Sequence, residues 1–485
     1  MRRLLVLIVV VAGLGHVRAD VPASQSVTFL HFNDVYEIEP IEGGRYGGLA
    51  RVATVLARTR RTSAPVIATL GGDFLSPSAI SWARLDGEPM AARQMVAVLN
   101  AVGVDWATLG NHEFDLGEAV FRARIAEAKF KLVSTNVTDA AGQPFAGIVP
   151  SAIVPVRFGG RTIRIGLLGV TIDQNRQPWV RYAPPIDAAK AAVASFKGRV
   201  DAVVALTHLS LAGDQDLVEA VPEIDLSLGG HEHENWLMRR GPNFTPIVKA
   251  DANARSVAIV TMTFGAPGGK PGIAVRFESL DSRVPEDRRV QAEVRRWMSL
   301  GYDAFRRDGF NPDEVVATIT SPLDGRAATI RNRPGTLTDL ILAGLLRETR
   351  ADIAILNGGS IRIDDVVQPG PVRQYDVMRI VPFGGKVVSA ALDGAVLASV
   401  LDAGQANAGS GGYLHVRGVT RQDAAWTVND KPLDPAGHYV VAMPEFLLTG
   451  LESRMAFLTR TNPGVRDVKE FQDIRLAVIA ELRGK

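Results

Sequence analysis

The chain has 485 residues, of which 46 % are hydrophobic and 22 % are charged, and this length and balance suit a globular protein of two domains. Its 54 Lys and Arg residues nearly cancel its 52 Asp and Glu residues, so the charge gives no support for a nucleic-acid polymer as a partner. The absence of cysteine excludes disulfides and thiolate metal sites, and it leaves nitrogen and oxygen donors as metal ligands.

The first 19 residues have the pattern of a secretory signal peptide. Arg2 and Arg3 precede an apolar segment from Leu4 to Leu14, and Val17-Arg18-Ala19 resembles a cleavage site. The apolar segment is too short for a typical membrane-spanning helix, although an uncleaved anchor is the alternative. Without residues 1–19 the chain carries 51 basic and 52 acidic residues. We therefore expect a periplasmic or secreted protein with no stable membrane anchor after cleavage.

Residues 20–284 are predicted to form a layered α/β domain, because apolar strand-like runs alternate with stretches of helical spacing. The predicted strands are Phe29–Phe32, Val66–Leu70, Val102–Leu109, Val203–Thr207 and Ile224–Leu228. The predicted helices are Tyr46–Arg60, Met90–Val102 and Leu116–Ala128.

The character of the chain changes after this domain. Residues 285–311 are strongly charged and carry one apolar stripe at helical spacing, which predicts a single connecting helix. Residues 312–485 are predicted to form a second domain. Its strands are expected at Ile353–Leu356 and His438–Met443, and its helices at Leu337–Arg347 and Ala390–Leu401.

Five apolar runs of the first domain end in Asp, Asn or His. The polar groups are Asn33-Asp34, Gly72-Asp73, Asn111-His112-Glu113, His208 and His231-Glu232-His233. Ligands bind just beyond strand ends in open α/β sheets, so these side chains are expected to gather in one site. Each group alone is commonly a turn or a solvated histidine, but the five together indicate a centre for two adjacent divalent ions. The donor types favour zinc or manganese, with magnesium, calcium or iron as further possibilities.

These motifs, in this order, resemble the signature of the calcineurin-like metallophosphoesterases. The second half of the chain extends the resemblance, because it contains motifs similar to those of the C-terminal domain of the 5′-nucleotidase family. These motifs are Asn357-Gly358-Gly359-Ser360-Ile361-Arg362 and Pro382-Phe383-Gly384-Gly385. The resemblance implies a four-layer αββα metallophosphoesterase domain joined by a linker helix to a smaller α/β nucleotide-binding domain.

The resemblance also implies a role for each side chain of the metal centre. Asp73 is expected to bridge the two ions, and the other implied ligands are Asp34, Asn111, His208, His231 and His233. His112 is expected to stabilise charge on the phosphoryl group or the leaving oxygen, and Asp115 to orient and charge His112. Glu113 is expected to be structural.

Tyr36 departs from the family pattern, because it stands where a ligating histidine is usual. A phenol has a pKa near 10 and binds metal well only as phenolate. Tyr36 is therefore predicted to be either a metal ligand or an aromatic wall of the site.

The family pattern places the nucleotide on the second domain. The matching positions are Arg331, Asn357, Arg362, Phe383 and Phe446. The two phenylalanines are expected to sandwich the base, and such stacking accepts several bases. The alternative for each ring is a place in the hydrophobic core.

Two departures in the second domain weaken the inference to an unmodified mononucleotide. A stretch that is glycine-rich in the family reads Gly450-Leu451-Glu452-Ser453-Arg454 in this chain. Glu452 could provide the carboxylate that binds a ribose hydroxyl, but it stands in a bulkier loop. Thr336-Leu337-Thr338-Asp339 replaces the usual Asn-Leu-Gly-Asn. The metal motifs are not affected by these changes.

We therefore predict an exported metal-dependent phosphohydrolase that releases phosphate from nucleoside 5′-monophosphates by attack of metal-bound hydroxide. Alternatives with related chemistry are a cyclic-nucleotide phosphodiesterase, a nucleotide-sugar diphosphohydrolase and a sulfur-carrier hydrolase of the same superfamily. A non-catalytic periplasmic binding protein on the same scaffold is the alternative of another class, but binding alone would not need the pair His112 and Asp115.

Overall fold

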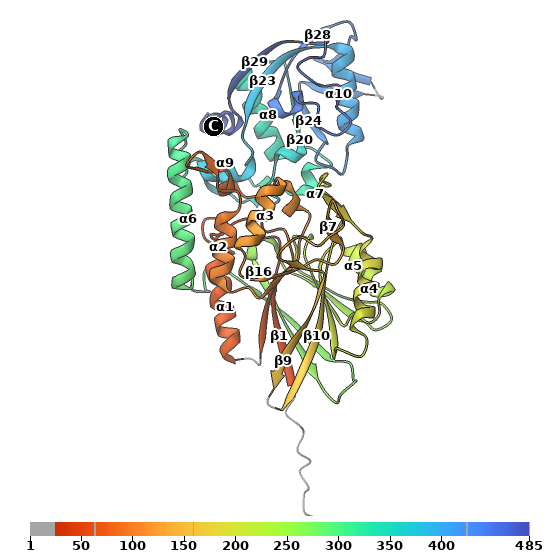
Figure 1. Ribbon diagram of the computed structural model, residues 1–485. Coiled ribbons are helices and arrows are strands. Elements are labelled where there is room, and N and C mark those ends of the chain that lie inside the picture. Colours follow the sequence, from red (N-terminus) through yellow and green to blue (C-terminus); the bar gives the residue numbers. More distant parts are fainter. Residues whose placement is uncertain (1–24, 63–64, 159, 423–424, 485) are drawn as a thin grey trace, which may run out of the picture.

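A computed structural model describes residues 25–62, 65–158, 160–422 and 425–484. The predicted signal peptide, residues 1–19, lies outside the described residues. The described chain forms a larger N-terminal unit, at the bottom of Figure 1, and a smaller C-terminal unit above it. No helix in these ranges combines the length and the apolar character needed to cross a membrane.

Two β-sheets pack face to face in the N-terminal unit. The seven-stranded sheet has the order β17 (Gly272–Ser279), β16 (Ser256–Phe264), β1 (Gln25–Phe32), β2 (Val66–Leu70), β5 (Trp106–Ala107), β6 (Lys131–Val133) and β8 (Ile148–Val149). The six-stranded sheet has the order β14 (Trp236–Arg240), β15 (Thr245–Lys249), β13 (Leu226–Gly229), β12 (Ala202–His208), β10 (Arg161–Thr171) and β9 (Ser151–Phe158). Apolar side chains of both sheets, such as Phe29 and Leu206, fill the space between them.

Helices cover the outer face of each sheet and complete four layers, which confirms the predicted fold class. Three helices lie on the seven-stranded sheet: α1 (Leu49–Thr62), α2 (Arg93–Val102) and α3 (Glu118–Glu127). Two helices lie on the six-stranded sheet: α4 (Pro185–Phe196) and α5 (Leu211–Ala220). The strand predicted over Val102–Leu109 is wrong in extent, because α2 ends at Val102 and only Trp106–Ala107 pairs with neighbouring strands.

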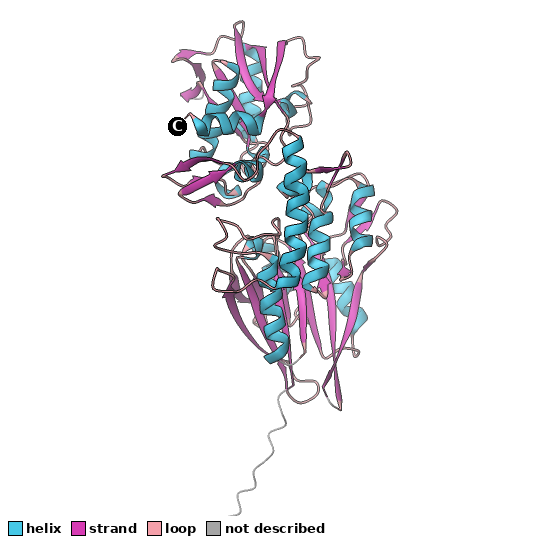
Figure 2. Ribbon diagram, turned by 90° about the vertical axis from the view of Figure 1, so that its left-hand side faces the viewer, coloured by secondary structure: helices cyan, strands magenta, loops and turns pink. Residues whose placement is uncertain are grey.

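A long helix, α6 (Arg288–Arg307), leads from the N-terminal to the C-terminal unit (Figure 2). It packs against α1 and α2 through a buried stripe that includes Val290, Val294 and Met298. Its first turn is capped by Asp287, whose side chain accepts hydrogen bonds from the backbone N–H groups of residues 289 and 290.

The C-terminal unit is built on a five-stranded sheet. Its order is β24 (Leu414–Arg417), β20 (Ile353–Asn357), β28 (His438–Pro444), β23 (Lys386–Asp393) and β29 (Val465–Asp473). Two helices, α8 (Thr336–Thr349) and α11 (Ile474–Arg483), cover one face, and α10 (Gly394–Ala406) covers the other. The helix predicted over Ala390–Leu401 is wrong at its start, because Ala390–Asp393 belong to β23.

The two units contact each other at the end of the β-sandwich that carries the loop after β1. Glu37, in the loop after β1, is buried against α9 (Gln374–Ile380) of the C-terminal unit. One of its carboxylate oxygens lies 3.1 Å from Nε of Arg379, and the other accepts a 3.1 Å hydrogen bond from the hydroxyl of Tyr375. This docking brings the C-terminal unit onto the loops that carry the predicted metal ligands.

Candidate active site

The predicted metal ligands follow the carboxyl ends of parallel strands. In the seven-stranded sheet, β1 and β2 run into the loops that carry Asp34 and Asp73. In the six-stranded sheet, β12 ends at His208, and β13 runs into the loop that carries His231. Parallel strands present their carboxyl ends at one edge, and the two sheets face each other, so these side chains meet at one end of the sandwich.

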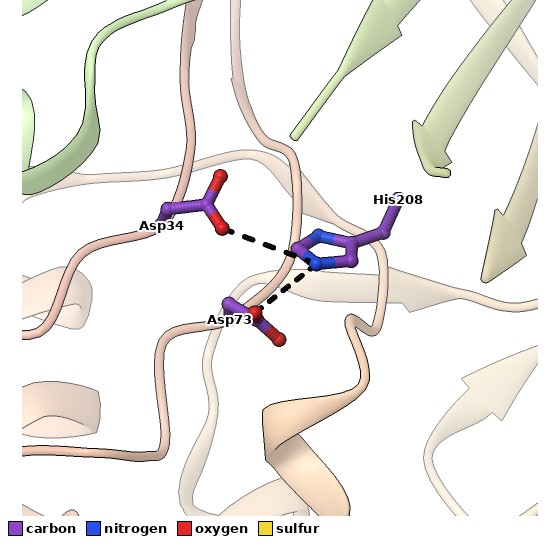
Figure 3. A group of neighbouring side chains, drawn as sticks. All are labelled: Asp34, Asp73 and His208. Carbon is purple, nitrogen blue, oxygen red and sulfur yellow. Dashed lines mark ion pairs between the residues drawn. The ribbon is translucent and has the colours of Figure 1, made fainter. Parts of the chain in front are cut away.

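Asp34, Asp73 and His208 form the buried centre of this site (Figure 3). Nε2 of His208 lies 3.1 Å from Oδ2 of Asp73 and 3.9 Å from Oδ1 of Asp34. Nδ1 of His208 lies 2.7 Å from the carbonyl oxygen of Gly71, which can only accept a hydrogen bond. Nδ1 therefore carries a proton, and Nε2 is the atom that faces the carboxylates.

The buried charges of this centre perturb one another. Burial lowers the pKa of His208, but the carboxylates of Asp73 and Asp34 outweigh this effect and raise the pKa to about 9. Burial raises the pKa of Asp73, but His208 and His112 hold it well below its usual range. A proton on His208 thus compensates the carboxylates in the metal-free protein, and a bound cation would take over this role.

Tyr36 and His233 adjoin Asp34. The hydroxyl of Tyr36 lies 3.3 Å from Oδ1 of Asp34 and 3.1 Å from Nε2 of His233. Burial, together with the carboxylates of Asp34 and Asp73, raises the pKa of Tyr36 well above its usual value. The phenol therefore keeps its proton in the metal-free protein and donates to Asp34. This position suits both roles predicted for Tyr36, that of a ligand and that of a wall.

One buried atom supports a cation site here. Oδ1 of Asn111 has no hydrogen-bond partner among the described residues. A buried polar atom without a partner is costly, and a bound ion would satisfy it. His231 borders the same cavity as Asn111, and burial lowers its pKa to about 3, so its ring is neutral and available as a ligand. Carboxylate, imidazole and amide donors fit zinc or manganese.

The backbone is strained at three of the predicted ligands. Asp34, Asp73 and His231 have φ values of 52°, 53° and 78°, which cost about 1–3 kcal/mol each for residues other than glycine. The strained backbone conformation at Asp73 is stabilised by Glu113, whose carboxylate accepts hydrogen bonds from the N–H groups of residues 73, 74 and 75. Glu113 therefore clamps the loop that presents Asp73.

Lys249 fixes two further ligand loops, and this residue is absent from the sequence-based site. Its side chain is fully buried, and its Nζ lies 2.8 Å from Oδ2 of Asp214. Nζ donates to the backbone carbonyls directly after His208 and directly before His231, at 2.6 and 2.7 Å. The signal in the sequence is a single lysine within an apolar strand, where a charge is retained only if it is paired.

His112 and Asp115 form the pair expected from the sequence. Nδ1 of His112 lies 2.7 Å from Oδ2 of Asp115. Asp115 also accepts hydrogen bonds from Ser76 at 3.0 Å and from Asn175 at 2.8 Å, and Asn175 was not predicted. Burial raises the pKa of Asp115, but His112 and the other polar neighbours bring it below its usual value, so Asp115 is a carboxylate.

Two adjoining cavities connect this site with the C-terminal unit. The larger, of about 1030 Å³, is lined by Asp73, His112 and Arg331 among others. The second, of about 740 Å³, lies within the C-terminal unit and is lined by Phe383 and Phe446, each 40 % exposed. The two cavities share wall residues Gly359, Arg362, Ser410 and Gly411. Both rings are thus in position to contact a ligand that also reaches the metal centre.

Asn357 and Glu452 lie side by side in the wall of the second cavity. Nδ2 of Asn357 donates a 2.8 Å hydrogen bond to Oε2 of Glu452, and Oδ1 of Asn357 accepts one of 2.6 Å from Ser360. Glu452 is only 9 % exposed. The structure therefore brings together the six predicted substrate residues around the two cavities, with Asn357 and Glu452 already bonded to each other.

Comparisons with known proteins agree with this two-unit fold. Residues 27–235 match the calcineurin-like phosphoesterase family, and residues 315–459 match the 5′-nucleotidase C-terminal domain. The chain is similar to the 5′-nucleotidase of Bos taurus, with 25 % identity over 449 residues, 81 % of this chain and 74 % of the relative. It is similar to protein UshA of Escherichia coli strain K12, with 24 % identity over 493 residues, 87 % of this chain and 85 % of the relative.

A solved structure supports the fold. The crystal structure of a 5′-nucleotidase precursor from Thermus thermophilus matches this chain with a TM-score of 0.75 and 23 % identity. The match covers 95 % of this chain and 96 % of that chain. Both units of the present structure therefore occur together, in the same order, in a protein of similar length.

Proposed function

We propose that this chain, which belongs to the 5′-nucleotidase family of metallophosphoesterases and is therefore a hydrolase, releases phosphate from nucleoside 5′-monophosphates. The observation that carries the proposal is the junction of the two cavities at Arg362. A base between Phe383 and Phe446 can extend its phosphate through this junction toward His112. The relatives named 5′-nucleotidase support this substrate class.

The proposed organisation follows the sequence-based boundaries. Residues 20–284 act as the catalytic domain, residues 285–311 as the connecting helix, and residues 312–485 as the substrate-binding domain. We further propose export, because residues 1–19 combine a basic start, an apolar core and a small-residue cleavage site.

In the proposed mechanism, bound divalent ions would activate water and stabilise the charge that develops on the phosphoryl group. Asp34, Asp73, Asn111, His208, His231 and His233 would hold these ions. The chain's own contribution to the chemistry centres on His112. Because Nδ1 of His112 faces Asp115, its Nε2 is left to donate a proton or a hydrogen bond to a phosphoryl or leaving oxygen.

Two arginines support binding of the phosphate in this scheme. Arg331 and Arg362 both line the larger cavity, and the guanidinium of Arg362 lies 4.0 Å from Oδ2 of Asp115. The guanidinium of Arg362 also lies over the ring of Phe383, with 5.1 Å between Cζ and the ring centroid. Arg362 therefore connects the phosphate region with the base region through a single side chain.

A second candidate function is hydrolysis of a phosphodiester or diphosphate, such as a cyclic nucleotide or a nucleotide sugar. The observation that favours it is the extent of the larger cavity, which continues past the metal centre to Trp236 and Arg326. This space would accept a second substituent on the phosphorus atom.

Phosphate release from AMP in the presence of Mn²⁺ tests the proposal. His112→Ala should lower kcat by about 10²–10⁴-fold, because it removes the positioned proton donor. His438→Ala is the matched control, since Nδ1 of His438 also pairs with a carboxylate, that of Asp393 at 2.9 Å, but on the exposed surface of the C-terminal unit. Equal phosphate release by the wild type and His112→Ala would contradict the mechanism. Activity on diesters alone would favour the second candidate.

A further inference from the structure

The imidazole of His233 lies between the two units. Its Nε2 faces the metal centre, 3.4 Å from Oδ1 of Asp34 and 3.1 Å from the hydroxyl of Tyr36. Its Nδ1 faces the C-terminal unit, 2.5 Å from Oδ2 of Asp364. One side chain thus joins the catalytic loops to a carboxylate that is 131 residues away in the sequence.

Asp364 is itself held in place. Its Oδ1 accepts a hydrogen bond from the backbone N–H of Ala327, and its backbone has a φ of 40°, a strained value for a residue with a side chain. Its neighbour Asp365 forms an ion pair with Arg255 of the N-terminal unit. Asp364 is therefore a fixed carboxylate on a segment that docks against the metal-bearing loops.

A carboxylate at one nitrogen of an imidazole has a defined chemical effect. It retains the proton on that nitrogen, fixes the rotation of the ring, and leaves the lone pair of the other nitrogen for a metal ion. At His233 the carboxylate is at Nδ1 and the free nitrogen is Nε2, which is the atom that faces Asp34. Carboxylates of this kind commonly change metal affinity by about 10- to 100-fold.

We propose that Asp364 is a positioning residue of the metal centre, supplied by the C-terminal unit, which orients His233 to bind the ion next to Asp34. This proposal rests on the metal role proposed above for His233. It goes beyond that role because it makes the affinity for one ion depend on docking of the substrate-binding unit. The ion held by the other ligands should depend much less on Asp364.

Metal titration of the full chain by calorimetry, with Zn²⁺ or Mn²⁺ and no substrate, tests the proposal. Asp364→Ala should weaken one of two binding events by about 10- to 100-fold. Asp364→Asn should have a smaller effect, because the amide oxygen can still accept from Nδ1. Asp365→Ala is the matched control, because it removes the adjacent ion pair between the units without touching His233. Thermal unfolding of each metal-free variant shows whether it is folded.

The outcomes separate this proposal from the proposed function. If the wild type binds two ions and Asp364→Ala binds both with unchanged affinity, the positioning role is refuted while the metal centre stands. If Asp364→Ala and Asp365→Ala weaken binding equally, Asp364 acts only through docking, and the orienting role is refuted. If the wild type binds no ion, the metal role of His233 fails, and the inference fails with it.

Discussion

Replacement of Phe446 by alanine tests whether the exposed rings of the C-terminal unit bind a base. Phe446 and Phe383 are both 40 % exposed in the wall of one cavity, so both rings are accessible to a ligand. The ring of Phe383 also contacts the guanidinium of Arg362, and it forms a T-shaped pair with the ring of Trp82, with 5.5 Å between centroids. The ring of Phe446 has no aromatic or cationic contact among the described residues, so Phe446→Ala removes stacking surface without moving a charged group.

The size of the effect follows from the stacking energy. A base stacked on an aromatic ring gains about 1–3 kcal/mol, which corresponds to about 5- to 150-fold in a binding constant. We expect kcat/KM of Phe446→Ala for AMP to fall by a factor in this range, mainly through KM. For a small aryl phosphate, whose ring stays next to the phosphorus atom, kcat/KM should remain close to that of the wild type.

Phe457 provides a matched control for Phe446. Phe457 is 37 % exposed in the same unit but does not line the cavity, so Phe457→Ala should leave both substrates unaffected. Equal losses for AMP and the aryl phosphate in Phe446→Ala would refute base stacking and would mean that the ring supports the fold.

Two further changes probe the metal centre and the contact between the units. Asp73→Asn should prevent loading of both ions, because Asp73 is the proposed bridge; two ions per chain by elemental analysis of this variant would contradict the bridging role. Burial, with the nearby charge of Glu37, raises the pKa of Glu39 from 4.5 to about 7. The wild type should therefore lose stability as the pH rises between these values, because the folded state binds a proton that the unfolded state has released. Glu39→Gln should avoid this loss, so urea unfolding should show it to be more stable than the wild type at about pH 8 and similar at about pH 4. An equal difference at both pH values would show that Glu39 does not titrate in this way.

Periodicity predicted the central strands of the sandwich but not every boundary. The predicted runs Val66–Leu70 and Val203–Thr207 correspond to β2 and β12, because these strands are almost entirely buried and mostly apolar. The predictions failed at Val102–Leu109 and Ala390–Leu401, where an apolar run crosses a junction between a helix and a strand. When both elements are buried, the hydrophobic pattern does not change at the junction, so it cannot locate the boundary.

The sequence best predicted those site residues that lie close together in the chain. His112 and Asp115 are three residues apart in a short 3₁₀ helix, η2 (His112–Asp115), and this spacing places their side chains on one side. Residues that support the site from a distance carry no comparable signal. Asn175 reaches Asp115 from a loop 60 residues away, and only the packing of the two sheets brings them together.

The sequence motifs did not predict the contacts between the two units. Glu37 pairs with Arg379, 342 residues away, and His233 pairs with Asp364, yet neither pair follows a periodic pattern. Glu37 directly follows Tyr36, and His233 faces Asp34. The C-terminal unit therefore contacts the same loops that would hold an ion next to Asp34. A metal motif read in one domain therefore predicts the ligands, whereas the proposed orientation of His233 depends on Asp364 of the other domain. Substrate binding and metal binding are expected to be coupled, because both depend on the docking of the segment from Arg362 to Asp365.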